Sequence, residues 1–334
     1  MKTKSFKLKE VDDKDMLFSR VKRGKGFSYL NESKKTIRDK KAVDYFKSLG
    51  IPPMWEEVHI CKHKDGHIQA IGRDKKGRKQ YIYHPEYEKN RQAEKFLKMY
   101  DFASFLPDIR KRAYQDIKIK EWHKEKVLAL LLLVLDEYGI RVGNKQYLKS
   151  NQTFGLTTLR RKHMTVEGKD LVFQYKGKSS QEREVHIDDP FLIPFIKECA
   201  GLPGYEIFRY QDDAGKYHDI DSDDVNEYIT TYMGSSFSSK DFRTWSASRL
   251  AIDLYPDAIA MQKTDKRKKF ANILIGLVAS ELGNTPTVCR EYYVHPNIFK
   301  EAIDQRIPHP NPFKDPKYTY ELSASEQLAV KLIH

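Results

Sequence analysis

The sequence is poor in cysteine and has no long apolar run. Its three cysteines, Cys61, Cys199 and Cys289, are too sparse for a disulfide framework, and their spacing matches no metal site. The longest apolar run, 127–135, is far shorter than the about 20 residues of a membrane span. The N-terminal residues MKTKSFKLKEVDDKD are charged throughout and lack the apolar stretch of a secretory signal. We therefore expect a cytoplasmic protein with no membrane partner.

The signatures of several large enzyme classes are absent as well. The sequence contains neither the GxxxxGKS/T nor the GxGxxG phosphate-binding loop, and neither HExxH nor GxSxG occurs. Carboxylates are not paired at a metal-binding spacing. Tyrosine, arginine and lysine side chains remain as the groups that could carry chemistry.

Positive charge is abundant. The chain has 60 Lys plus Arg against 47 Asp plus Glu, a formal net charge of +13. Its charged fraction of 32% exceeds the roughly 25% of an average protein. Such a balance favours a polyanionic partner, with nucleic acid as the first candidate. A basic protein that is merely soluble remains the alternative at this point.

The pattern changes along the chain from β-rich to helical. Runs such as EEVHICKH, HIQAIGRD and KQYIYH are rich in β-branched and aromatic residues, and turn signals separate them. From residue 86 onward apolar residues recur at helical spacing. We place a domain boundary near residues 86–92, with a β-rich domain over 1–88 and a mainly helical domain over 89–334.

The helical part has one β interruption. HMTVEGKDLVFQYKGKSSQEREVHID reads as three short strands, and helices resume after it. The last segment, SASEQLAVKLI, begins with a capping box at Ser323 and Glu326, although the sequence assigns no role to 311–334. The predicted class is α+β: a small β-rich N-terminal domain, then a mainly helical domain with a three-stranded β insertion.

The stretch LGNTPTVCREYYVHP predicts a short, isolated helix. Thr285 is its N-cap, Pro286 takes the first helical position, and Pro296 is expected to stop it. Tyr292 and Tyr293 are adjacent on this helix and point roughly 100° apart. One tyrosine can therefore pack in the core while the other faces a partner.

These residue types suit phosphodiester chemistry. Tyrosine can act as a nucleophile, arginine can stabilise charge on phosphorane oxygens, and lysine can protonate a departing 5′-oxygen. Each candidate also has a structural explanation. Arg141 follows a helix C-terminus, Arg243 lies in the first turn of a helix, and Lys178 lies in a hairpin turn.

Four segments that contain these residues, taken together and in chain order, indicate a function far more specifically than any single residue does. RVGNKQYLKSNQTFGLTTLRRKH, YKGKSSQEREVH, SSKDFRTW and LGNTPTVCREYYVHP closely resemble the catalytic segments of type IB DNA topoisomerases, the small kind found in bacteria and poxviruses. GFSYL, IPPMWEEVHI, GHIQAIGRDKKGRKQYIYHPEY and LPDIRKR in the first part resemble that family too. The resemblance covers roughly residues 20–300.

The resemblance implies a role for specific residues. Tyr293 matches the nucleophile that forms a 3′-phosphotyrosine, and Tyr292 becomes a packed or supporting neighbour. Arg141 and Arg243 match the two arginines that clamp the phosphate.

Three further residues match the family's catalytic set. Lys178 matches the lysine that protonates the 5′-oxygen, and Lys240 a second lysine that assists it. Asn284 stands where poxvirus members carry histidine and the bacterial kind also shows asparagine. Its amide can donate a hydrogen bond to a non-bridging oxygen but carries no charge.

Further residues are predicted to bind DNA. Tyr81 and Tyr83 alternate and would share one face of a strand, although both could instead fill the core of the small domain. On the helical side, Arg290 precedes Tyr293 by three residues and shares its helix face. By resemblance, the contacts in the small domain are Arg78, Gln80, Tyr81 and Tyr83.

The resemblance implies an isomerase that encircles duplex DNA, nicks one strand, lets the duplex swivel and reseals it. Exchange of one phosphodiester for another conserves bond energy, so we expect no ATP. The arginines take the place of a metal ion, so we expect no metal and no other cofactor. We further expect a monomer, associated with the nucleoid if the protein is bacterial. A tyrosine recombinase or integrase remains the alternative, although its usual histidine three residues before the second arginine is Lys240 here. A DNA-binding protein without activity is a third possibility.

Overall fold

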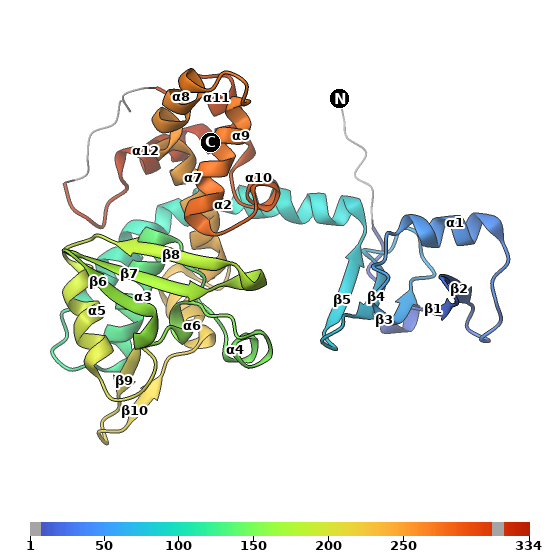
Figure 1. The fold of residues 1–334 in the computed structure, drawn as a ribbon, viewed down its shortest axis with the longest axis horizontal. Coiled ribbons are helices and arrows are strands. Elements are labelled where there is room, and N and C mark those ends of the chain that lie inside the picture. Colours follow the sequence, from blue (N-terminus) through green and yellow to red (C-terminus); the bar gives the residue numbers. More distant parts are fainter. Residues whose placement is uncertain (1–7, 309–316) are drawn as a thin grey trace. The chain divides into compact units, whose positions relative to one another are not determined.

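A computed structural model describes residues 8–308 and 317–334 of the chain. It divides into two compact units, Met1–Lys95 and Phe96–His334. The division falls inside helix α2 (Pro85–Asp116), which begins in the small unit and continues into the large one. The sequence places the boundary at 88/89, close to the start of this helix. Each unit is described below by itself (Figure 1).

The small unit is built on one antiparallel sheet with the strand order β2-β1-β3-β4-β5. The three β runs read from the sequence correspond to β3, β4 and β5, and the turn between the last two ends on Gly77, whose φ of +73° suits glycine. Helix α1 buries Phe46 among residues of the sheet. The bounds are η1 (Asp13–Asp15), β1 (Phe18–Arg23), β2 (Gly26–Leu30), α1 (Lys40–Ser48), β3 (Glu56–Ile60), β4 (Ile68–Arg73) and β5 (Lys79–Tyr83).

The large unit packs its helices around α3 (Lys124–Tyr138), which is apolar on all sides and buried from Lys126 to Asp136. A helix without a polar face has to lie inside the unit, because no side of it can be left in water. The other helices are α4 (Lys145–Asn151), α5 (Leu192–Gly201), α6 (Ser222–Met233), α7 (Ser239–Asp253), α8 (Tyr255–Thr264), α9 (Phe270–Leu282), α10 (Pro286–Tyr292), α11 (Pro296–Ile303) and α12 (Ala324–Ile333).

A three-stranded antiparallel sheet interrupts the helices, as the sequence predicts, so the expected α+β class is confirmed. Its order is β6-β7-β8, and Leu171 and Phe173 of β7 are buried in the main core. A second, two-stranded ribbon was not predicted. The bounds are η2 (Leu156–Thr158), η3 (Arg161–His163), β6 (Met164–Glu167), β7 (Asp170–Lys176), η4 (Lys178–Ser180), β8 (Glu182–Ile187), β9 (Arg209–Gln211) and β10 (Tyr217–Asp219).

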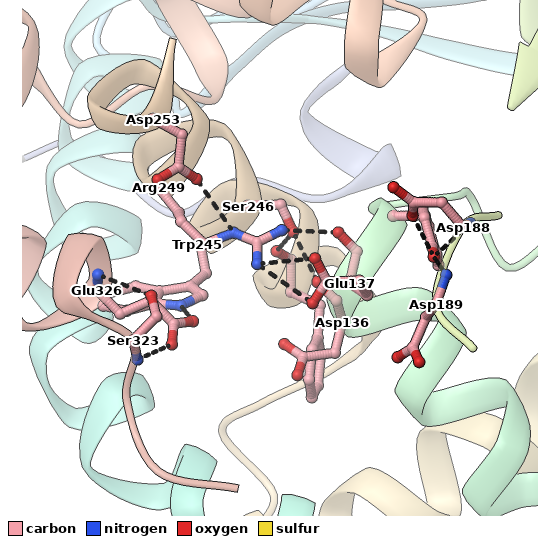
Figure 2. Close-up of polar contacts among 12 residues, drawn as sticks. Asp136, Glu137, Asp188, Asp189, Trp245, Ser246, Arg249, Asp253, Ser323 and Glu326 are labelled. Atoms are coloured by element: carbon pink, nitrogen blue, oxygen red, sulfur yellow. Dashed lines mark hydrogen bonds and ion pairs between the residues drawn. The ribbon is translucent and has the colours of Figure 1, made fainter. Parts of the chain in front are cut away.

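Helix α12 is fastened to the core by a buried carboxylate, Glu326, which is only 1% exposed. The capping box predicted at Ser323 is present, with the Glu326 side chain accepting from the Ser323 backbone N–H at 2.9 Å. The same carboxylate accepts from Trp245 Nε1 of α7 at 2.8 Å (Figure 2) and from Arg110 Nη2 of α2 at 2.6 Å. Arg110 in turn bonds Asp136 of α3 at 2.6 Å. One network thus joins α2, α3, α7 and α12.

Electrostatics favour the ionised form of Glu326. Burial alone would raise the pKa of this carboxyl, but the guanidiniums of Arg110 and Arg249 and the Trp245 N–H outweigh it and hold the pKa well below its usual range. The folded chain therefore binds protons at this site less readily than the unfolded chain. Its contribution to stability is complete at neutral pH and is lost as the pH falls.

We expect Glu326→Gln to lower the free energy of unfolding at pH 7 by about 3 kcal/mol, because breaking a buried ion pair leaves a charge uncompensated. The difference in free energy of unfolding between wild type and variant should shrink from about pH 5 towards pH 3, since protonation of the wild-type carboxyl removes its ion pair. Urea unfolding at both pH values measures this gap. Glu121→Gln, at an exposed position, is the matched control and should follow wild type. A gap that stays constant or widens in acid would contradict the assignment.

Candidate functional site

Arg141 lies just beyond α3, on a segment held rigidly by its backbone. Its carbonyl oxygen accepts from Leu156 N at 2.8 Å. A side chain at Gly155 would place its Cβ 2.6 Å from that oxygen, so only glycine fits there. The guanidinium bonds Gly283 O at 3.1 Å and the Asn284 Oδ1 atom, both beyond the end of α9. The simplest structural explanation would have Arg141 cap the C-terminus of its own helix, α3. Its guanidinium instead bonds groups beyond the end of α9.

Arg243 projects from the second turn of α7 into the same place and is only 5% exposed. It donates to the carbonyls of Gly139, at the end of α3, and Leu282, at the end of α9, the latter at 3.0 Å. It also donates to Asn284 Oδ1 at 3.4 Å. The side chain thus ties two helix C-termini together, and both guanidiniums share one amide oxygen.

The charge of this pair is not neutralised. In residues 8–308 and 317–334 no carboxylate lies within ion-pair distance of Arg141 or Arg243. Their acceptors are carbonyl and amide oxygens and the Tyr293 hydroxyl, whose hydrogen bond favours the charged form of both arginines. Burial lowers the pKa of both groups, and the nearby Arg141 charge helps to bring that of Arg243 to about 10. A buried cation (Arg243) and a half-buried cation (Arg141) beside a neutral acceptor form a site that suits an anion.

Two donors in this cluster are also unused. Arg243 Nε and Asn284 Nδ2 are buried and have no hydrogen-bond partner in the part of the chain that the structure describes. Buried donors without a partner cost free energy, and native proteins keep few of them. An anion rich in oxygen acceptors would satisfy both donors and both charges.

Tyr293 lies beside this pair. Its half-buried ring packs on the main core, and the Arg243 guanidinium carbon lies 5.4 Å from the ring centroid. The predicted start of α10 at Pro286 is confirmed. The predicted end is wrong: the helix stops at Tyr292, Tyr293 takes non-helical angles (φ −124°, ψ −50°), and Pro296 opens α11 instead. The chain leaves the helix at the residue that faces the arginines.

The other tyrosine of the pair faces outward. Tyr292 is 40% exposed, so of the two expected roles, packed or supporting, the packed one is wrong and the supporting one stays a prediction. It is the last helical residue of α10, and the change of backbone angles at Tyr293 separates the directions of the two side chains. Of the two rings, only that of Tyr293 packs against the main core.

The two lysine side chains take no part in the hydrogen bonds that join the arginine pair. Lys178 opens the turn between β7 and β8, Lys240 lies in the first turn of α7, and both are exposed. Neither side chain makes a hydrogen bond or ion pair within residues 8–308 and 317–334. The structure thus brings Arg141, Arg243, Asn284 and Tyr293 together, and leaves the two lysine side chains in solvent.

The predicted DNA contacts of the small unit cluster on its edge strand. Tyr81 is 39% exposed, and its ring stacks on that of half-buried Tyr83 at 5.7 Å between centroids. The interpretation that both fill the core is therefore wrong. The Asp74 carboxylate holds the two polar residues predicted to bind DNA: it accepts from Arg78 at 2.7 Å and from Gln80 Nε2 at 3.0 Å. The strand presents a flat aromatic surface flanked by polar groups.

Two more arginines lie near the large unit's cluster. Arg290 is exposed on α10, with its guanidinium carbon 5.1 Å from the centroid of the Phe299 ring. Arg183 of β8, which the sequence reasoning missed, donates to Ser280 O at 2.8 Å and Glu281 O at 2.6 Å. An arginine in a short, polar strand gives no local sign that its side chain reaches a helix far along the chain.

Comparison with known proteins identifies the family of this chain. Residues 79–308 match the family model described as eukaryotic DNA topoisomerase I, catalytic core, and residues 26–74 match bacterial DNA topoisomerase IB, N-terminal domain. The chain belongs to the type IB DNA topoisomerases. These are isomerases, and the mixed α+β architecture described above is that of the family.

Individual relatives are named DNA topoisomerase 1B. DNA topoisomerase 1B of Acanthamoeba polyphaga mimivirus is 33% identical over 82% of this chain and 84% of its own length. DNA topoisomerase 1B of vaccinia virus (strain Copenhagen) is 25% identical over 86% and 90%. A solved structure of the XerH site-specific recombinase bound to difH substrate is 20% identical, with a TM-score of 0.32 over 66% of this chain and 55% of that one.

The described residues contain neither a helix that could span a membrane nor a cluster of metal-binding side chains. Within 8–308 and 317–334, none of the helices has both the length and the apolar character needed to traverse a membrane. The same residues contain no group of three or more His, Cys, Asp or Glu side chains that could hold a metal ion.

Asn284→Asp tests the uncompensated charge. We expect the variant to melt about 4 °C higher, because a carboxylate between two guanidiniums forms charge-assisted hydrogen bonds in place of neutral ones. Inorganic phosphate should raise the Tm of wild type and have little effect on the variant, whose site already holds a negative charge. Differential scanning fluorimetry measures both effects.

The matched control is Asn272→Asp, an exposed position on α9, which should respond to phosphate as wild type does. Equal protection of Asn284→Asp and wild type by phosphate would show that the arginine pair is not an anion site.

Proposed function

We propose that this protein relaxes supercoiled duplex DNA by transient cleavage of one strand, with Tyr293 as the nucleophile. The observation that carries the proposal is the pair of guanidiniums, Arg243 buried and Arg141 half-buried, that lies beside Tyr293 and has no carboxylate partner within residues 8–308 and 317–334. A phosphodiester in this place would supply both the negative charge and the oxygen acceptors that the cluster lacks. The net charge of +13 and the exposed aromatic strand β5 support DNA as the partner.

The reaction is a transesterification. The Tyr293 hydroxyl oxygen attacks the phosphorus, an O–P bond forms, and the bond to the 5′-oxygen breaks, which leaves a 3′-phosphotyrosine. Arg141, Arg243 and the free Nδ2 of Asn284 stabilise the charge on the non-bridging oxygens in the transition state. Attack by the 5′-hydroxyl then reverses the step and reseals the strand. Because one ester replaces another, the bond energy is conserved and ATP is not required.

Two protons move during cleavage: the tyrosine hydroxyl loses one, and the 5′-oxygen gains one. We assign the second transfer to Lys178, with Lys240 assisting. Both side chains are exposed and are not held by another residue within 8–308 and 317–334, so they are free to meet a bound strand. Arg290 and the small unit's residues Arg78, Gln80, Tyr81 and Tyr83 are assigned to DNA binding.

Tyr293→Phe tests the nucleophile. It removes one hydroxyl and no charge, so we expect relaxation to disappear while DNA affinity, which phosphate contacts dominate, stays close to wild type. The assay is relaxation of a supercoiled plasmid in EDTA without ATP, together with trapping of the covalent adduct in detergent.

Tyr292→Phe is the matched control, since it removes the same group from the exposed neighbour. It should keep most of its activity. A covalent adduct formed by Tyr293→Phe, or lost in Tyr292→Phe, would reverse the assignment.

Lys178→Ala tests the proton donor. We expect cleavage to slow by roughly 100-fold or more, since an alkoxide leaves poorly without a proton. If sulfur replaces the bridging 5′-oxygen, the leaving thiol has a pKa of about 8.5 and departs as thiolate without help. The variant should then cleave the sulfur substrate nearly as fast as wild type.

Arg141→Ala provides the comparison, because a group that stabilises non-bridging charge should gain much less from sulfur. If sulfur fails to restore Lys178→Ala selectively, Lys178 is not the donor and Lys240 becomes the next candidate.

A further inference from the structure

Arg183 connects the hairpin that carries Lys178 to the helix end that precedes Asn284. It stands on β8 directly opposite Tyr175 of β7. Its two terminal nitrogens donate to the carbonyls of Ser280 and Glu281, at 2.8 and 2.6 Å, in the last turn of α9. Glu281 O is one of the last carbonyls of the helix, which lack an i+4 donor, while Ser280 O also accepts from the C-cap N–H of Gly283 at 3.2 Å. The side chain thereby spans from the sheet to α9.

Two glycines hold this side chain closely. A Cβ added to Gly283 would lie 2.6 Å from Arg183 Cδ, and one added to Gly177 would lie 2.9 Å from Arg183 Cγ. Gly177 immediately precedes Lys178, and Gly283 immediately precedes Asn284. The arginine therefore lies between the backbones that carry the proposed proton donor and the proposed phosphate ligand.

The turn that carries Lys178 is itself rigid. Gly177 N donates to Gln181 O at 2.7 Å, and Ser180 N donates to Gly177 O at 3.1 Å. Ser179 and Ser180 both have positive φ, 61° and 60°, a conformation that is unusual for residues with a side chain. A rigid turn moves as one body, so a contact at its base sets the direction of the lysine.

Arg183 also belongs electrostatically to the arginine cluster. Its charge helps to lower the pKa of Arg141. Burial raises the pKa of the Tyr175 hydroxyl, and the guanidiniums of Arg183, Arg243 and Arg141 oppose that rise. The hairpin thus approaches the phosphate site through Tyr175 and Arg183, while Lys178 lies at its tip.

We infer that Arg183 is a positioning residue that fixes the Lys178 turn against the Asn284 end of α9 and so aims the lysine at the departing 5′-oxygen. The inference rests on the proposed function. A role confined to capping α9 would affect stability and every step of the reaction alike, whereas a role in aiming the proton donor affects departure of the 5′-oxygen selectively.

The experiment measures single-turnover cleavage of a DNA duplex with either oxygen or sulfur at the bridging 5′ position. Arg183→Met keeps the length of the side chain and removes its donors. We expect it to cleave the oxygen substrate roughly 100-fold more slowly than wild type, as for loss of a general acid. It should cleave the sulfur substrate nearly as fast as wild type.

A double variant separates aiming from a general loss of activity. Lys178→Ala with Arg183→Met should cleave the oxygen substrate no more slowly than Lys178→Ala alone, because both changes remove the same proton transfer. Arg161→Met is the matched control. Arg161 also donates to a backbone carbonyl, that of Leu202 at 3.1 Å, but within the described residues it makes no hydrogen bond or ion pair with α9. The Arg161→Met variant therefore measures the effect of removing one positive charge elsewhere in the large unit. It should cleave both substrates like wild type.

Each remaining outcome has a distinct meaning. If Arg183→Met slows both substrates equally, or if the double variant is slower in proportion to both changes, Arg183 does not act through Lys178 and the inference is wrong. If sulfur does not restore Lys178→Ala, the assignment of the proton donor falls and this inference falls with it. Should Arg183→Met fail to fold, judged by circular dichroism and thermal unfolding, Arg183→Lys carries the same comparison of oxygen with sulfur.

Discussion

Two arginine side chains, buried Arg243 and half-buried Arg141, share one neutral oxygen, that of the Asn284 amide, and the candidate site depends on this contact. Arg141 reaches it from the end of α3 and Arg243 from α7, while Asn284 follows α9. A carboxylate would hold the arginines more firmly but would cancel their charge. The neutral amide oxygen aligns the two arginines without cancelling their positive charge, which can then bind an anionic ligand. Carbonyls at two helix ends supply the remaining bonds, which explains why three helices converge here.

Local rules predicted much of this framework. The capping box at Ser323, the helix start at Pro286, the strands β3, β4 and β5 of the small unit and the three strands of the β insertion follow from patterns a few residues long, and the structure confirms them. The resemblance to a known family added the order of the candidate residues. Composition indicated a polyanionic partner, because a net charge of +13 has no structural purpose of its own.

What the sequence could not predict depends on contacts between distant segments. The partners of Arg141 lie 142 and 143 residues further along the chain, so its position after a helix left two explanations open. Pro296 predicts a helix that carries both Tyr292 and Tyr293, whereas the helix ends at Tyr292, and Tyr293 takes non-helical angles and packs against the core. Arg183 was missed because its partners lie 97 and 98 residues away.

Helix α12 also bears on how the polypeptide is made. It lies outside residues 79–308, which match the family's catalytic core, and it is translated after α2, α3 and α7. A product that ends before it lacks Glu326, so the buried Trp245 N–H loses its acceptor and Arg110 loses one of its two carboxylates. Such a product has a larger unfolded fraction and is a better substrate for cellular proteases. The buried ion network therefore makes the stability of the arginine-bearing unit depend on α12, the last helix of the chain to be synthesised.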